Sequence, residues 1–108
     1  MRKDKRNQDR RLEDLRSVSL TIDNETYRLK DLSPAGFSFI TGDPNDFKVG
    51  EILSPITLGF DLHNDVIVGK IVHITSMPDS RNRWIVGLKF LFSEDEREYF
   101  NELLKQIG

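Results

Sequence analysis

The stretch from Tyr27 to Phe39, YRLKDLSPAGFSF, predicts two strands joined by a short polar loop. Apolar and polar residues alternate on both sides of the loop, which is the pattern of a strand with one buried face. The loop itself, Asp31 to Gly36, carries serine, proline and glycine, which are common turn formers. We therefore expect this loop to connect two neighbouring strands of one sheet.

Upstream of the loop, the alternating residues from 17 to 22 predict another strand and hence a β-hairpin. The turn is expected at Asn24-Glu25, with Asp23 paired to Thr26. In that register the numbers of paired residues sum to 49, so position 18 faces 31 and Arg16 lies beside Ser33. The hairpin would then bring the N-terminal segment to the Asp31–Gly36 loop.

Downstream, apolar alternation predicts three more strands, at about 52–62, 66–75 and 83–92. The strand at 66–75 is apolar on both faces and is expected to be central. His63 to Asp65 are expected to form a turn. Ser93 and Glu96 form a capping-box pattern that predicts a helix at about 94–107.

Six short strands followed by one amphipathic helix predict an all-β fold with a C-terminal helix. A six-stranded antiparallel β-barrel is favoured because closure leaves no exposed sheet edge. A chain of 108 residues suits one domain. We divide it into a basic N-terminal tail, 1–16, that acts as a switch segment, and a barrel with its helix, 17–108.

Charge is distributed unevenly along the chain. The net charge is −2, yet residues 1–16 carry seven Lys/Arg against four Asp/Glu. Positive charge confined to one end favours a small anionic ligand over a long polyanion, so a nucleic-acid partner is not expected. The chain lacks cysteine and a secretory signal, and no apolar run is long enough to span a bilayer, which predicts a cytoplasmic protein without membrane insertion.

Neither catalysis nor metal binding is expected. Asp61, His63 and Asp65 fall near one turn, but two carboxylates and one imidazole do not complete a metal site. His73 shares a predicted strand face with Ile67 and Ile71, which favours a place inside the barrel. No nucleophile–base pair is recognisable, so the chain is predicted not to be an enzyme.

The loop and the basic tail together suit a guanine nucleotide. The carboxylate of Asp31 can accept hydrogen bonds from the Watson–Crick edge of guanine. An arginine fork matches O6 and N7 of guanine, or clamps a phosphate. Ser33 offers a hydroxyl, and Gly36 allows a positive φ or the close approach of a ligand to the backbone.

These residues resemble a known family. The pattern Asp31-x-Ser33-x-x-Gly36 after a hairpin, with Arg-x-x-x-Arg upstream and Gly87-Leu-Lys-Phe90 in the last strand, resembles the PilZ domain, a bacterial receptor of cyclic di-GMP. The resemblance implies a six-stranded antiparallel barrel that binds the dinucleotide on its outer surface. It also implies that the arginine motif wraps over the ligand, while the Asp-x-Ser-x-x-Gly loop holds a guanine base.

Several arginine pairs could supply the upstream motif. Arg6 and Arg10 have the required four-residue spacing and are preferred, with Arg11 as a helper. Arg2 with Arg6 has the same spacing further from the loop, and Arg16 stays an alternative because of the hairpin geometry. The predicted ligand-binding residues are Arg6, Arg10, Arg11, Asp31, Ser33 and Gly36.

The function predicted from the resemblance is that of a cyclic di-GMP receptor without a cofactor. Nucleotide binding is expected to order the arginine-bearing tail and to signal to an unidentified protein effector. The domain is expected to be a monomer or a weak dimer. The alternative is a degenerate PilZ-like module that binds a protein and no nucleotide.

Overall fold

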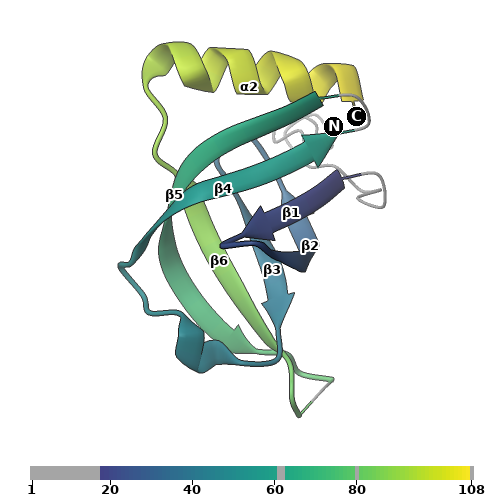
Figure 1. The fold of residues 1–108 in the computed structure, drawn as a ribbon, viewed down its shortest axis with the longest axis vertical. Helices are drawn as coiled ribbons and strands as arrows, with labels where there is room; N and C mark the ends of the chain where they lie inside the picture. Colours follow the sequence, from purple (N-terminus) through teal and green to yellow (C-terminus); the bar gives the residue numbers. More distant parts are fainter. Residues whose placement is uncertain (1–17, 61–62, 80, 108) are drawn as a thin grey trace, which may run out of the picture.

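The computed structural model describes residues 18–60, 63–79 and 81–107, and these residues form a closed antiparallel barrel with a helix across one end (Figure 1). Around the barrel the strands are hydrogen-bonded in the order β1-β2-β3-β6-β5-β4. The predicted six-stranded antiparallel barrel with a C-terminal helix is confirmed. In chain order the elements are β1 (Val18–Ile22), β2 (Glu25–Leu32), β3 (Gly36–Thr41), the 3-10 helix η1 (Pro44–Asp46), β4 (Ile52–Phe60), β5 (His63–Ser76), β6 (Trp84–Phe90) and α2 (Glu94–Ile107).

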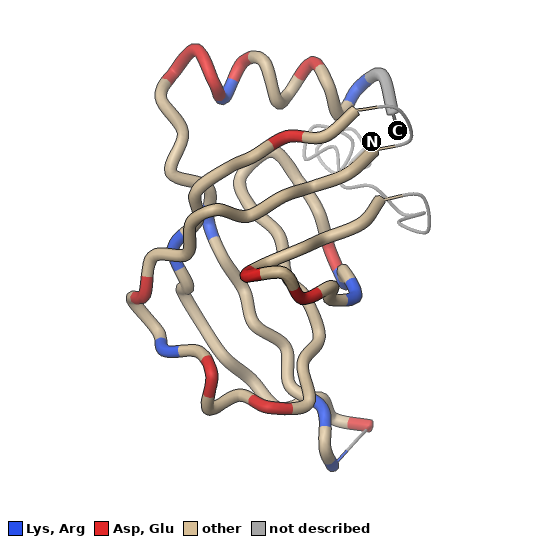
Figure 2. Tube along the Cα trace, in the orientation of Figure 1, with Lys and Arg blue, Asp and Glu red and all other residues tan. Residues whose placement is uncertain are grey.

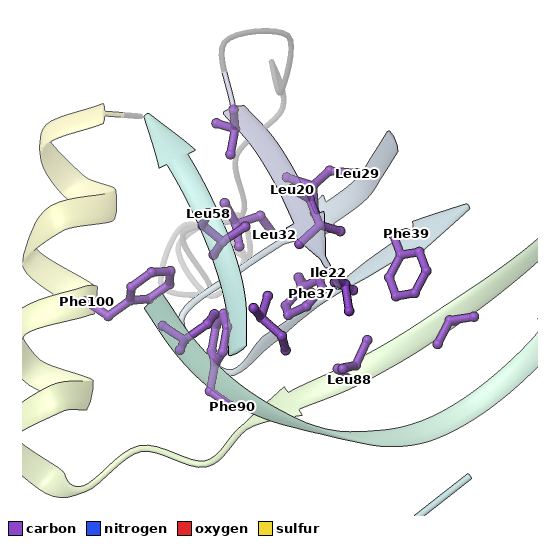
Figure 3. Close-up of a cluster of buried hydrophobic side chains, with 14 of the residues drawn as sticks. Leu20, Ile22, Leu29, Leu32, Phe37, Phe39, Leu58, Leu88, Phe90 and Phe100 are labelled. Atoms are coloured by element: carbon purple, nitrogen blue, oxygen red, sulfur yellow. The ribbon is translucent and has the colours of Figure 1, made fainter. Parts of the chain in front are cut away.

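The core fills the barrel with apolar side chains from every strand (Figure 3). Alternate residues point inward because successive side chains of a strand face opposite sides of the sheet. Burial of these side chains is the main stabilising contribution, at roughly 1.5 to 3 kcal/mol for each large one. The fully buried ones are Leu20, Leu32, Phe39, Ile56, Leu58, Ile71, Val86, Phe100 and Leu104.

Aromatic side chains close the barrel at the end opposite the helix. Phe47, just after η1, is buried, and its ring packs 5.3 Å from Phe39 and 5.9 Å from Tyr27. Partial burial raises the pKa of Tyr27, and its hydrogen bond to the Glu25 carboxylate raises this pKa further. The loop between β3 and β4 therefore acts as a lid on the core.

The helix α2 covers the other end of the barrel (Figure 1). Phe100 reaches from the helix to Phe90 and Phe92, with ring centroids 4.8 and 5.3 Å apart. The neighbouring Tyr99 is 51% exposed, and its hydroxyl lies 2.9 Å from Nε2 of His63. In the described part of the chain, no helix has the length and apolar character needed to cross a bilayer.

The predicted capping box at the start of α2 is confirmed. The backbone N–H of Glu96 donates to Ser93 Oγ at 3.2 Å, and the backbone N–H of Ser93 donates to the Glu96 carboxylate at 2.9 Å. Acidic residues occupy the first turn, seen as red positions in Figure 2, where they favour the positive end of the helix dipole. The local sequence therefore fixes where the helix begins.

Removing this cap has a measurable cost. We expect Ser93→Ala to lower the free energy of unfolding by about 1 kcal/mol, because Glu96 N–H loses its acceptor at a helix terminus. Chemical denaturation of the variant measures the change. Ser76→Ala, an exposed serine at the end of β5, is the control and should stay within about 0.5 kcal/mol of the wild type. Equal effects of the two substitutions would contradict a role for the cap.

The predicted hairpin turn is wrong by one residue, and the register is wrong by two. Ile22 pairs with Glu25, so paired residue numbers sum to 47 and not to 49. Asp23 and Asn24 both have positive φ, +53° and +68°, which is the geometry of a two-residue type I′ turn. The corrected register brings Val18 level with Leu29. Because β1 and β2 are antiparallel, Val18 still lies at the end of the barrel that carries the Asp31–Gly36 loop.

Two other boundaries differ from prediction. His63 to Asp65, expected as a turn, belong to β5 and pair with Phe60 to Leu58 of β4. β5 is also not buried on both faces, since Val66 and Val72 on its outer face are 69% and 45% exposed. Its β-branched residues reflect strand propensity and not double burial. β6 ends at Phe90, two residues before the predicted end.

Candidate functional site

The loop at the centre of the prediction is tighter than expected. Asp31 and Leu32 belong to β2, and Gly36 begins β3, which leaves Ser33 to Ala35 as the connection. Ser33 N–H donates to the Gly36 carbonyl at 2.9 Å, and Ala35 N–H donates to Ser33 Oγ at 3.3 Å. The Ser33 hydroxyl, predicted to face a ligand, therefore also holds the loop in shape.

Gly36 is required by the barrel itself. It does not have a positive φ, so the backbone conformation is not what requires glycine at this position. A Cβ atom at this position would overlap the Leu88 carbonyl oxygen and lie 3.0 Å from the Lys89 Cα. The close approach that needs glycine is thus between β3 and β6, where the Phe90 N–H also donates to the Ala35 carbonyl at 3.0 Å.

A row of four residues crosses the outer face of the barrel next to this loop. Asp31 pairs with Ser38, Ser38 pairs with Gly87, and Gly87 pairs with His73, so the row runs from β2 through β3 and β6 to β5. The two middle residues are small and the two end residues are large and polar. Small residues between larger ones make a shallow trough with Asp31 and His73 as its walls.

Both walls of the trough are formed at β-bulges. The pairing of β2 with β3 skips Lys30, and the pairing of β5 with β6 skips Val72. At each bulge two consecutive residues face outward between buried or partly buried neighbours, Lys30 and Asp31 on one side, Val72 and His73 on the other. A bulge re-aims side chains in this way, and bulges are common beside binding sites.

His73 is therefore not inside the barrel. The prediction grouped it with Ile67 and Ile71, but the extra residue at the bulge reverses the alternation after Ile71 and turns the imidazole outward. Its ring lies over Gly87, where a Cβ atom would overlap ring atoms including Nε2. The sequence gives no local signal for this position, because a bulge depends on the partner strand.

The trough forms a surface pocket of about 250 Å³. The predicted residues Asp31, Ser33 and Gly36 all line this pocket. Other residues that the prediction did not include also line it, among them Ser38, Val72, His73, Gly87 and Lys89. Strict alternation between Phe37 and Phe39 could have identified Ser38 as an outward-facing residue.

Hydrogen bonding orients the carboxylate of Asp31 in the pocket. Ser38 Oγ donates to Asp31 Oδ2 at 3.2 Å, and Lys30 Nζ lies 3.6 Å from the same oxygen. The Lys30 pair is exposed and contributes little to stability. Because the serine lies on the neighbouring strand, it fixes the direction in which the carboxylate points across the trough.

Two lysines add positive charge beside the pocket. Lys89 on β6 pairs with Lys70 on β5 and with Gly36 on β3, so the two lysines are neighbours on the outer face. Lys89 also lines a second pocket of about 520 Å³ on the other side of the loop, together with Pro34, Leu91 and Arg97. An anionic group placed over the loop would meet cations from both pockets.

The arginines predicted to complete the site, Arg6, Arg10 and Arg11, lie outside the described residues, as does Arg16. Among residues 18–60, 63–79 and 81–107, no three His, Asp or Glu side chains gather as metal ligands would. The described part of the site therefore offers a carboxylate acceptor and nitrogen donors, with the small residues Ser38 and Gly87 between them. That chemistry suits a flat, polar ring with attached anionic groups.

Comparison with known proteins identifies a family. A family model described as the PilZ domain matches residues 4–107, nearly the whole chain. No curated protein sequence matches the chain.

Several solved structures share the fold. The Legionella uncharacterized protein Lpg0364 is 16% identical, with a TM-score of 0.65 and coverage of 90% of this chain and 91% of that one. The K. pneumonia MrkH–c-di-GMP complex is 15% identical, with a TM-score of 0.72 over 90% of this chain and 50% of MrkH. The Bacillus subtilis inhibitor of motility, MotI/DgrA, is 14% identical, with a TM-score of 0.66 over 89% of this chain and 48% of that one. The chain thus spans about half the length of MrkH and MotI.

Proposed function

Because this chain belongs to the PilZ domain family, we propose that it is a receptor domain that binds cyclic di-GMP in the pocket beside the Ser33–Gly36 connection. PilZ domains are binding and regulatory domains and not enzymes. One solved neighbour with this fold is a complex with c-di-GMP. The proposal therefore combines the family, the fold of a ligand-bound neighbour and the chemistry of the pocket.

The observation that carries the proposal is the convergence of Asp31, Ser33 and Gly36 on one pocket. Asp31 accepts hydrogen bonds from the Watson–Crick edge of one guanine, in a direction fixed by Ser38. Ser33 and Gly36 shape the connection on which the base rests. Lys89 stands at the edge of the pocket, where it favours the negative charge of the phosphates.

Arg6, Arg10 and Arg11 supply the other half of the binding site in this proposal. They are joined to the barrel at Val18, which lies at the same end as the loop. Arg10 precedes Val18 by eight residues, an extended span of roughly 26 Å. That length is sufficient for the arginines to lie over a nucleotide on the outer face and bind its phosphates bidentately.

A calorimetric titration with cyclic di-GMP tests the function and reports affinity and stoichiometry together. Cyclic di-AMP is the matched control, because adenine lacks the N1–H and N2–H donors that Asp31 recognises. Heat of binding with cyclic di-GMP alone supports the proposal. Absence of binding with both ligands would reject it in favour of a degenerate PilZ-like module that binds a protein partner.

The signalling step is proposed to be an ordering of the arginine-bearing tail over the nucleotide. A ligand shifts such an equilibrium only if it binds the closed state more tightly, and arginine contacts to the phosphates supply that difference. The new surface created by the closed tail is what a protein effector would recognise.

Hydrogen exchange tests the ordering step. We expect amide protection across residues 1–16 to rise when cyclic di-GMP is added to the wild-type protein, because backbone amides near the bound arginines exchange more slowly. Asp31→Ala protein with the same ligand is the control and should show no rise. Unchanged protection in a wild-type protein that calorimetry shows to be saturated with ligand would reject the switch while leaving binding intact.

A further inference from the structure

His73 takes an unusual position across the barrel surface. It stands on β5 next to Val72 at the bulge, yet its imidazole extends over β6 and occupies the space where residue 87 would carry a side chain. A Cβ at Gly87 would overlap Nε2 and would lie 2.7 Å from both Cδ2 and Cε1. The Nε2 tip of the ring therefore points away from β5, toward the middle of the trough.

The surface between His73 and Asp31 is formed by the two small residues of the row. Gly87 has no side chain, and the Ser38 hydroxyl is turned toward Asp31. In a sheet, neighbouring strands lie about 4.8 Å apart, so the backbones of β2 and β6 are separated by roughly 10 Å across β3. The two walls thus belong to strands on either side of β3, and both line the pocket of about 250 Å³.

The two walls have complementary chemistry. The Asp31 carboxylate is an acceptor, whereas Nε2–H of His73 is a donor in one neutral tautomer and in the imidazolium. Guanine has donors on its Watson–Crick edge and the acceptors N7 and O6 on the adjacent edge. One base can therefore be bound from both walls at once.

Resting on the proposed function, we propose that His73 is a second base-binding residue, which donates a hydrogen bond from Nε2 to N7 of the guanine bound by Asp31. The bulge at Val72 turns the histidine outward, and Gly87 leaves room for its ring. His73 thereby completes the described half of the site on the side opposite Asp31.

Calorimetry with His73 variants tests this contact. We expect His73→Ala to weaken cyclic di-GMP binding by about fivefold, the usual loss for one neutral hydrogen bond. His73→Gln keeps an N–H donor at a similar reach and should stay within about twofold of the wild type. His63→Ala is the matched control, because His63 bonds to Asp65 and Tyr99 outside the pocket and should leave affinity unchanged.

A modified ligand identifies the acceptor atom. A cyclic dinucleotide with 7-deazaguanine bases, which lacks the N7 acceptor, should bind the wild type about fivefold more weakly than cyclic di-GMP and should bind His73→Ala no more weakly. Equal losses in both proteins would overturn the inference, because the analogue would then report another donor. An unchanged affinity for cyclic di-GMP in His73→Ala would also overturn it.

A substitution at Gly87 provides an independent test. Gly87→Ala should weaken binding as much as His73→Ala, because the new methyl group displaces the imidazole. In the His73→Ala background it should cause little further loss, since the three atoms nearest to the added Cβ all belong to His73. If the wild type did not bind cyclic di-GMP, the proposed function would fail together with this inference. Wild-type binding that is insensitive to both substitutions would reject the role of His73 alone.

Discussion

We expect Asp31→Ala to weaken cyclic di-GMP binding by about 100-fold or more. In the proposed complex the carboxylate accepts charge-assisted hydrogen bonds from two donors of the guanine edge, each contributing roughly 1.5 to 3 kcal/mol. Their combined loss should exceed that of any single neutral contact in the pocket. Calorimetry on the purified variant measures the change. Asp31→Asn keeps one acceptor oxygen and the size of the side chain. Its affinity for cyclic di-GMP should lie between those of Asp31→Ala and the wild type.

Two controls distinguish the loss of the guanine contacts from a change in net charge and from a loss of folded protein. Asp46→Ala removes the same charge from the exposed end of η1, at the far end of the barrel, and should leave affinity unchanged. Asp31→Ala also leaves the buried Ser38 hydroxyl without this acceptor, at a cost of about 1 to 3 kcal/mol. Titration must therefore be carried out well below the unfolding temperature of the variant. Wild-type affinity in a folded Asp31→Ala protein would refute the assigned site.

Gly36→Ala is expected to lower the free energy of unfolding by about 3 kcal/mol. The added Cβ would overlap the Leu88 carbonyl oxygen, and a backbone atom in a paired strand cannot rotate away as a side chain can. Relief requires β3 and β6 to separate, which also weakens the bond from Phe90 N–H to the Ala35 carbonyl. In a domain of this size the midpoint of thermal unfolding should fall by about 10 °C or more.

Gly42→Ala is the matched control for this substitution. Gly42 follows the other end of β3, and a Cβ there would meet Asn82 O at an ordinary 3.6 Å. We expect its free energy of unfolding to change by about 0.5 kcal/mol or less. Similar destabilisation by both substitutions would contradict the steric role of Gly36. The result does not depend on any ligand, so it tests the architecture separately from the proposed function.

The parts of the fold that local sequence determines were predictable. Alternation of apolar residues identified the strands and the barrel, since one buried face imposes a period of two. Ser93 and Glu96 identified the start of the helix, because their mutual hydrogen bonds involve only neighbouring residues. Asp31, Ser33 and Gly36 were identified by their spacing, and the structure brings all three to one pocket.

Features that depend on a partner strand were not predictable in the same way. Asn24-Glu25 and Asp23-Asn24 are both polar pairs, and the choice between them rests on two residues accepting positive φ. An error of one residue at the turn became an error of two in the register. The outward position of His73 depends on its pairing with Gly87 of the neighbouring strand β6, which the alternation within β5 does not reveal.

The two bulges have a consequence for how this site can change. At the two bulges beside the trough, Lys30 has no counterpart on β3 and Val72 has none on β6, and both residues are exposed. The barrel interior does not require either side chain, so both can vary without repacking the core. New side chains at these positions would alter the rim of the trough directly. The surface proposed to contact the ligand can therefore diversify while the set of buried residues stays constant.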